Sequence, residues 1–172
     1  SMNTICFLTT QDIRVPAITA AQMREVDRIA IEDIGLGILQ MMENAGRNLA
    51  ENVMDMVGET GGEIVVLAGG GGNGGGGLCC ARHLHNRGFR VDVVLDRDVM
   101  TLKEAAAAQW RILQAAGLNP LPPHDLTPAL ERADLVVDAL IGYSLRGAPR
   151  GRAAELIAYC NEYAARVLAL DV

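Results

Sequence analysis

The sequence predicts an α/β fold, a Rossmann-like three-layer sandwich in which a mostly parallel sheet carries helices on both faces. Apolar runs rich in β-branched residues recur along the chain and have the length and composition of buried strands; they cover 63–68, 90–95, 135–142 and 166–172. Segments with helical spacing or alanine-rich composition separate these runs. Such alternation produces right-handed crossovers and a parallel sheet covered on both sides.

Composition bounds the class of protein. The chain has 172 residues, half of them hydrophobic and a fifth charged, which suits one globular domain with a core. A net charge of −6 and only 3% aromatic residues give no reason to expect a nucleic-acid partner. Without a membrane-length apolar run or a signal-peptide pattern, we expect a cytoplasmic protein with no membrane partner. The four cysteines lack zinc spacing and are expected to be reduced and mostly in the core.

The first third of the chain predicts an arm and two helices. Residues 1–18 show no sustained periodicity and form the expected N-terminal arm, with Ser1 and Met2 placed ahead of the native start. The run from Thr19 to Gln22 is a capping box, which predicts a helix that ends near Gly35. An apolar stripe predicts a second helix over 38–57. Its methionines are expected in the core and its Glu43 on the solvated outer face.

A glycine run is the most informative stretch. Eight of the nine residues from Gly69 to Gly77 are glycine, the exception being Asn73, and a helix is predicted from Leu78 to the residue before Gly88. Because glycine disfavours regular structure, a ligand that needs bare backbone N–H groups is the expected compensation. A flexible linker is the less favoured alternative. His83 and His85 have no partner in spacing and are expected on the helix surface.

The residues of this turn exclude one class of nucleotide site and leave another open. The run lacks a Gly-Lys-Ser/Thr ending, so it is not a P-loop for nucleoside triphosphates. Gly69-x-Gly71-x-x-Gly74 does match the dinucleotide pattern, and the acid that should follow is Asp92 or Asp96. A nicotinamide dehydrogenase therefore remains an alternative at this point.

Three features fall at the ends of predicted strands. A capping box from Thr101 to Glu104 predicts a helix to Ala116, and further helices are expected from Thr127-Pro128 and over 152–164. Asp138 interrupts an apolar strand, where a lone carboxylate is costly unless it is paired or bound to a cation. A loop rich in glycine and arginine follows, and Asp171 ends the last strand. Since ligands bind at the carboxyl ends of parallel strands, the glycine turn, Asp138 and Asp171 predict one composite site.

Taken together, these stretches resemble the YjeF N-terminal-domain family, whose characterised members are NAD(P)H-hydrate epimerases. The matching segments are 19–27, 42–47, the glycine turn with 81–84, 137–142 and 168–172, in that order. The resemblance therefore spans residues 19–172, which we take as the domain. The family's Pro-Ser-Gly continuation after Val172 is absent, so we expect the natural domain to extend further.

The resemblance implies an epimerase that interconverts the R and S forms of hydrated NADH and NADPH, so that a dehydratase repairs the S form. It implies a homodimer, a bound potassium ion and a fused or separate dehydratase partner. By motif position, Asn73 and Asp138 contact potassium. Asp138 is also the candidate catalytic acid–base residue, because a carboxylate at a buried strand exit has a tunable pKa. The implied substrate-binding residues are Gly72, Asn73, Gly74, Gly75, Gly76, Gly142, Tyr143, Ser144, Leu145, Arg146, Gly147, Ala148 and Asp171.

Two positions depart from the family pattern. Gly72 stands where the family has asparagine, and Gly76 stands where it has aspartate. Phosphate binding through backbone N–H groups survives both changes. A non-catalytic nucleotide-binding or dimerising scaffold on the same fold is therefore an alternative function.

Overall fold

The structure is a computed structural model that describes residues 6–58, 61–143 and 145–170. The chain divides after Gly37 into two units, which are described separately. The predicted division into an arm of residues 1–18 and a domain of residues 19–172 stays a prediction.

The first unit contains a short hairpin and a helix. Strands β1 (Cys6–Leu8) and β2 (Arg14–Pro16) pair antiparallel. Helix α1 (Ala20–Arg28) begins at the predicted capping box: the Thr19 hydroxyl accepts the Gln22 N–H at 3.2 Å, and the Gln22 side chain accepts the Thr19 N–H at 2.8 Å. The helix widens into a π-helical turn, η1 (Ile29–Asp33), and the chain then turns at Gly35 with φ of 81°.

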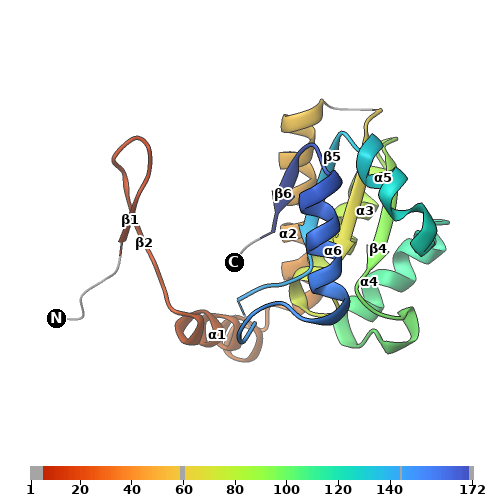
Figure 1. The fold of residues 1–172 in the computed structure, drawn as a ribbon. Coiled ribbons are helices and arrows are strands. Elements are labelled where there is room, and N and C mark those ends of the chain that lie inside the picture. Colours follow the sequence, from red (N-terminus) through yellow and green to blue (C-terminus); the bar gives the residue numbers. More distant parts are fainter. Residues whose placement is uncertain (1–5, 59–60, 144, 171–172) are drawn as a thin grey trace. The chain divides into compact units, whose positions relative to one another are not determined.

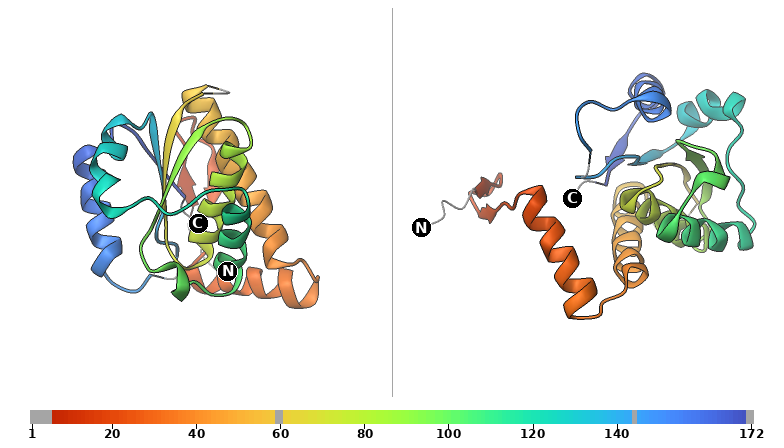
Figure 2. Two further views of the ribbon diagram at one scale, coloured as in Figure 1. Left: turned by 90° about the vertical axis from the view of Figure 1, so that its right-hand side faces the viewer. Right: turned by 90° about the horizontal axis from the view of Figure 1, so that it is seen from below.

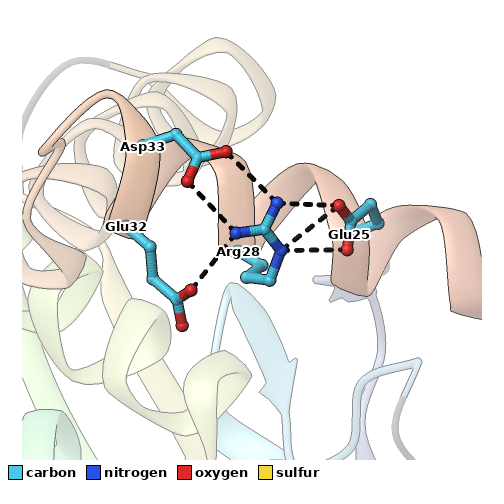
Figure 3. A network of polar contacts seen from close by, with 4 residues as sticks. All are labelled: Glu25, Arg28, Glu32 and Asp33. Atoms are coloured by element: carbon cyan, nitrogen blue, oxygen red, sulfur yellow. Dashed lines mark hydrogen bonds and ion pairs between the residues drawn. The ribbon is translucent and has the colours of Figure 1, made fainter.

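An arginine joins the two helical segments of this unit (Figure 3). The Arg28 guanidinium donates to Glu25 on α1 at 2.9 Å and to Glu32 and Asp33 on η1 at 3.2 Å. The hydrogen bonds to these carboxylates raise the pKa of Arg28. The network satisfies three acids around one cation on an exposed helix surface.

The second unit is built on a four-stranded parallel sheet in the order β4-β3-β5-β6 (Figure 1). This confirms the predicted parallel sheet and places the strand that leads into the glycine run at its centre, where Val66 pairs with Val93 and Val137. The strands are β3 (Glu63–Ala68), β4 (Arg90–Leu95), β5 (Leu135–Ala139) and β6 (Val167–Ala169).

Helices cover both faces of this sheet, as Figure 2 shows, which confirms the predicted three layers. One apolar cluster joins Ile64 and Val66 to the first face, and the other joins Val65 and Leu67 to the second. The first face is covered by α2 (Ile38–Val57), α3 (Gly72–His85) and α4 (Glu104–Ala115). The second is covered by α5 (Leu126–Arg132) and α6 (Gly151–Tyr163).

The core contains most, but not all, of the residues expected there. Met42 is buried, whereas Met56 on the same helix is 41% exposed. Three of the four cysteines, Cys79, Cys80 and Cys160, are buried and form no disulfide. Within the described residues no helix has the length and apolar character needed to cross a membrane.

Three helix starts differ by more than one residue from those predicted. Helix α3 begins at Gly72, not Leu78. The capping box predicted at Thr101 is wrong, because Thr101 ends a short 3₁₀ turn, η2 (Val99–Thr101), and Lys103 takes the N-cap position of α4. Asp98 caps that turn instead, accepting the Met100 N–H at 2.8 Å. Helix α5 begins at Leu126, directly after η3 (Pro123–Asp125), so Pro128 is its third residue, where its missing N–H still costs no helical hydrogen bond.

Candidate functional site

The exit of β3 presents bare backbone to solvent. Gly71 is the N-cap of α3, and Gly72 is its first residue. A Cβ at either position would meet no atom within 4 Å, so nothing in the described chain crowds these two residues. The N–H groups of a helix's first turn have no intrahelical acceptor and carry about half a positive charge between them. This helix start is suited to bind an anion.

The later glycines of the run are buried in the packing of α3, and each leaves room for a close neighbour. A Cβ on Gly74 would overlap the Gly69 carbonyl oxygen, and one on Gly77 would lie 2.5 Å from Ala139 Cβ. A Cβ on Gly75 would lie 2.6 Å from Met42 Cε, and one on Gly76 would lie 3.1 Å from a Leu170 methyl. Close approach of α3 to the sheet and to α2 thus explains much of the glycine content that we ascribed to a ligand.

A hollow of about 920 Å³ opens at this end of the sheet, and we call it the main hollow. It brings together seven of the predicted site residues: Gly72, Asn73, Gly142, Tyr143, Leu145, Arg146 and Ala148. Its other lining residues are Gly70, Gly71, Asp96, Arg97, Leu140, Ile141, Pro149, Arg150 and Ala153. Gly147 adopts φ of 80° in the same loop. Ser144 and Asp171 lie outside the described residues.

Asn73 fastens the glycine turn to the neighbouring loops. Its amide nitrogen donates to the carbonyl oxygens of Ile141 and Leu170, both at 2.8 Å. Within the described residues, no hydrogen bond reaches its Oδ1. The amide nitrogen is therefore committed to the fold, and the oxygen remains available to a ligand or cation.

Asp138 lies half-buried near the end of β5, two residues before Leu140, which lines the main hollow. Its Oδ1 accepts the Leu140 N–H at 3.0 Å, and its backbone carbonyl accepts the Leu170 N–H at 2.8 Å. Leu170 also accepts from Asn73, so these contacts bring Asn73 and Asp138 to the same strand exit. Burial, together with the Asp138 charge, raises the pKa of the nearby Cys160 thiol to about 11.

A second polar cluster connects α2 with α3, and the sequence did not predict it. Glu43 accepts from the Arg82 guanidinium, pairs with His83 Nε2 at 2.7 Å and accepts from Cys79 Sγ at 3.3 Å. Chiefly through the Arg82 hydrogen bond, the pKa of Glu43 falls to about 2. Burial raises the pKa of Cys79 to about 11. The Glu43 side chain is 47% exposed, so it is only partly solvated, and His83, whose side chain is 12% exposed, is not simply a surface residue.

One signal of this cluster was present in the sequence. Glu43 and Arg82 each belong to a stretch that carries the family resemblance, and Cys79 and His83 are four residues apart on one helix face. Ligand atoms of Glu43, Cys79 and His83 lie within 4.8 Å of one another, close enough to hold a metal ion. The Arg82 guanidinium already contacts both Glu43 and Cys79, so the cluster contains its own cation.

Comparisons with known proteins agree with this architecture. An NAD(P)H-hydrate epimerase of Dehalogenimonas lykanthroporepellens is 49% identical over 96% of this chain and 67% of its own length. An NAD(P)H-hydrate epimerase of Rhodopirellula baltica is 35% identical over 93% of this chain and 66% of its own length. A bifunctional NAD(P)H-hydrate repair enzyme Nnr of Hyperthermus butylicus is 39% identical over 91% of this chain but only 29% of its own length. The chain thus spans about two thirds of the epimerases and under a third of the bifunctional enzyme.

Structural comparison shows the same fold. The crystal structure of yeast ynu0 matches with a TM-score of 0.78 at 23% identity, covering 92% of this chain and 70% of the yeast chain. The sequence model of the family described as "YjeF-related protein N-terminus" matches residues 38–172, which include the whole of the second unit. The chain therefore belongs to the YjeF-related N-terminal family, as its motifs predict.

Proposed function

We propose that this chain is an epimerase that interconverts the R and S forms of hydrated NADH and NADPH. The observation that carries the proposal is the 49% identity, over 96% of the chain, to a protein named NAD(P)H-hydrate epimerase. The geometry of the main hollow supports it, since a volume of about 920 Å³ at the carboxyl ends of parallel strands suits a nucleotide-sized ligand.

The lining residues account for recognition of the nucleotide. Backbone N–H groups at the start of α3 bind the pyrophosphate, as helix N-termini bind anions in many α/β proteins. Arg146 and Arg150, both on the loop that lines the main hollow, add positive charge to a chain that is acidic overall. The described residues of this loop that line the main hollow would contact the substrate and help to orient it.

Asp138 is the proposed acid–base residue. Epimerisation must break one bond at the ring carbon that carries the hydroxyl group and re-form it on the opposite face. A carboxyl group assists both directions, because it donates a proton to the departing oxygen and accepts one when the bond re-forms. The hydrogen bond from Leu140 N–H to Oδ1 fixes the carboxyl and leaves Oδ2 to exchange the proton.

The same residues fit the potassium ion that the family resemblance implies. Asn73 Oδ1 and the Asp138 carboxylate are hard oxygen donors at one strand exit, and Asn73 Oδ1 accepts no hydrogen bond within the described residues. When bound, the ion would supply positive charge beside the anionic substrate. We further propose that the chain forms a homodimer and acts in the cytoplasm. It would act with an NAD(P)H-hydrate dehydratase, because some relatives are bifunctional repair enzymes.

The test starts from one pure epimer of NADPH hydrate and follows appearance of the other epimer by chromatography. We expect the chain to restore a mixture of both forms faster than the uncatalysed reaction, and Asp138→Asn to abolish that acceleration. Asp55→Asn removes an exposed carboxylate from α2 and serves as the matched control, with an unchanged rate. Absence of any acceleration by the unaltered chain would overturn the proposal.

A non-catalytic nucleotide-binding module is the second candidate. It is favoured by Gly72 and Gly76, where the family has an amide and a carboxylate. Space is open around Gly72, so an asparagine would fit there, whereas Gly76 faces a Leu170 methyl at 3.1 Å. This candidate would be selected if the chain binds NADPH in calorimetry but does not epimerise NADPH hydrate. In that case Gly72→Asn should also show no epimerisation.

A further inference from the structure

An ion pair at the edge of the main hollow has no role in the account above. Asp96 directly follows β4, and its backbone N–H donates to the Ala68 carbonyl at the end of β3, at 3.1 Å. Its side chain, 9% exposed, accepts two hydrogen bonds from Arg97, at 2.7 Å from Nε and 3.0 Å from Nη2. The guanidinium is thereby held in one orientation by a two-point contact.

This guanidinium lies against the glycine turn. A Cβ on Gly70 would lie 2.5 Å from Arg97 Cζ, so the arginine head group occupies the space that a side chain would fill. No described residue accepts a hydrogen bond from Nη1 of Arg97, and the side chain is 45% exposed. A fixed cation therefore presents a free donor beside the proposed phosphate-binding turn.

Asp96 and Arg97 line the main hollow and also a second hollow of about 530 Å³. Most of its other lining residues are apolar, and Arg152 adds a further cation. Its second acid, Asp98, already caps η2. The remaining lining residues are Val94, Leu95, Val99, Pro120, Leu121 and Pro123, an apolar surface on which an adenine ring can lie.

The topology gives this position a specific meaning. In doubly wound folds, the residue that ends the strand after the glycine turn and its helix faces the ribose 2′ position of a dinucleotide. Asp96 holds that position, whereas Asp92 lies within β4 opposite Val65 and pairs with Arg132 at 3.0 Å. A free carboxylate there accepts the 2′-hydroxyl of NADH, but both Asp96 oxygens are taken by Arg97.

We infer that Asp96 and Arg97 form a binding site for the 2′-phosphate of the adenosine ribose, so that the chain prefers NADPH hydrate to NADH hydrate. This inference rests on the proposed function for its substrate. Arg97 contacts the phosphate directly, and Asp96 is the positioning residue that holds the guanidinium over the glycine turn.

Epimerisation rates on the two substrates test the site. We expect kcat/KM to be about tenfold higher for NADPH hydrate, as one charge-assisted contact predicts. Arg97→Gln should lower kcat/KM for NADPH hydrate by roughly tenfold to a hundredfold, and that for NADH hydrate should be kept or raised, because the freed Asp96 carboxylate can accept the 2′-hydroxyl. Arg97→Lys keeps the charge but not the two-point contact with Asp96. Its kcat/KM for NADPH hydrate should lie between that of the unaltered chain and that of Arg97→Gln. The matched control is Arg111→Gln, which removes the same charge from an exposed position on α4 that lines neither hollow.

Two results would overturn the inference. An equal loss for both substrates would assign Arg97 to the pyrophosphate, which they share, and no loss for either would remove it from the site. Because Arg97→Gln leaves the Asp96 carboxylate unpaired, the double variant Asp96→Asn/Arg97→Gln is measured beside it and should show the same loss of discrimination with no unpaired carboxylate present.

A binding arm separates failure of this site from failure of the proposed epimerase activity. Calorimetric titration of the unaltered chain with 2′,5′-ADP and with 5′-AMP compares ligands that differ only by the 2′-phosphate. We expect the first to bind about tenfold more tightly and Arg97→Gln to erase the difference. If the chain epimerises neither substrate but keeps this difference, the proposed function fails and the 2′-phosphate site stands; equal binding of the two ligands refutes the site.

Discussion

Glu43 on α2 and Arg82 on α3 form an ion pair that joins two segments 39 residues apart. The Arg82 side chain is only 18% exposed, and the same carboxylate also holds His83 and Cys79. One glutamate thus fixes three side chains of the helix whose first turn forms the proposed phosphate site. Beside it, Gly46 packs so closely on Cys79 that a Cβ would lie 2.5 Å from Cys79 Cβ.

Glu43→Gln should therefore destabilise the fold. The substitution leaves the largely buried Arg82 without its anionic partner, a loss of about 1 kcal/mol in the free energy of unfolding once screening of the half-exposed carboxylate is allowed for. Urea unfolding followed by circular dichroism measures it. Glu51→Gln is the control on the same helix, because its pair with Arg47 is 3.8 Å long with both side chains more than half exposed, and it should cost less than about 0.5 kcal/mol. Equal effects of the two substitutions would contradict this role of Glu43.

The contribution of Glu43 should also depend on pH. Its pKa falls from 4.5 to about 2 in the folded state, so the folded chain binds the proton less readily than the unfolded chain. The stabilisation is complete above pH 4.5 and is lost as pH falls from there through about 2. The difference in unfolding free energy between the unaltered chain and Glu43→Gln should accordingly shrink between pH 5 and pH 3. A difference that stays constant over that range would contradict the assignment.

Local pattern was sufficient to predict some elements in full. Helix α2 has the predicted bounds because its apolar stripe is unbroken and Gly37 and Gly58 flank it. Strands β3 and β4 likewise have their predicted bounds, since each is a short apolar run between turn residues. The alternation of these elements was sufficient to predict the parallel sheet.

Contacts between distant segments decided what local pattern did not predict. Intrinsic propensity disfavours glycine in a helix, yet α3 starts inside the glycine run because tight packing of Gly74 and Gly77 on the sheet outweighs that propensity. The partners of Glu43 were not predicted because they lie 36 to 40 residues later in the chain. Asp96 was one of two alternatives, and the bond from Arg97 is visible only in three dimensions.

Alanine should have opposite effects at two glycines of α3, because Gly74 is tightly packed and Gly72 is open. Gly74→Ala should destabilise the chain by at least about 3 kcal/mol, because the new methyl group would overlap the Gly69 carbonyl oxygen, which is backbone and cannot move aside. Gly72→Ala meets no atom within 4 Å and should stabilise the chain by up to about 1 kcal/mol through its better helix propensity. Thermal unfolding of both variants measures the contrast. Tolerance of alanine at Gly74 would show that close packing is not the reason for glycine there.

Asn73 offers the sharpest test of how the turn is held. Asn73→Ala removes two hydrogen bonds to carbonyl oxygens and should cost about 1–3 kcal/mol. Asn73→Asp should cost more at neutral pH, because a carboxylate oxygen would face the Ile141 and Leu170 carbonyl oxygens at the amide's 2.8 Å separation. The introduced carboxyl would have a raised pKa in the folded state, so stability should recover as pH falls and the group protonates.

The matched control for Asn73 lies on α2. Asn52 donates a single exposed side-chain hydrogen bond to the Asn48 carbonyl at 3.0 Å, so Asn52→Ala and Asn52→Asp should each change stability by less than about 0.5 kcal/mol at neutral pH. Urea unfolding of the four variants at pH 7 and pH 4 separates the two positions. If Asn73→Asp were as stable as the unaltered chain at pH 7, the amide of Asn73 would not be the group that joins the glycine turn to the Asp138 strand exit.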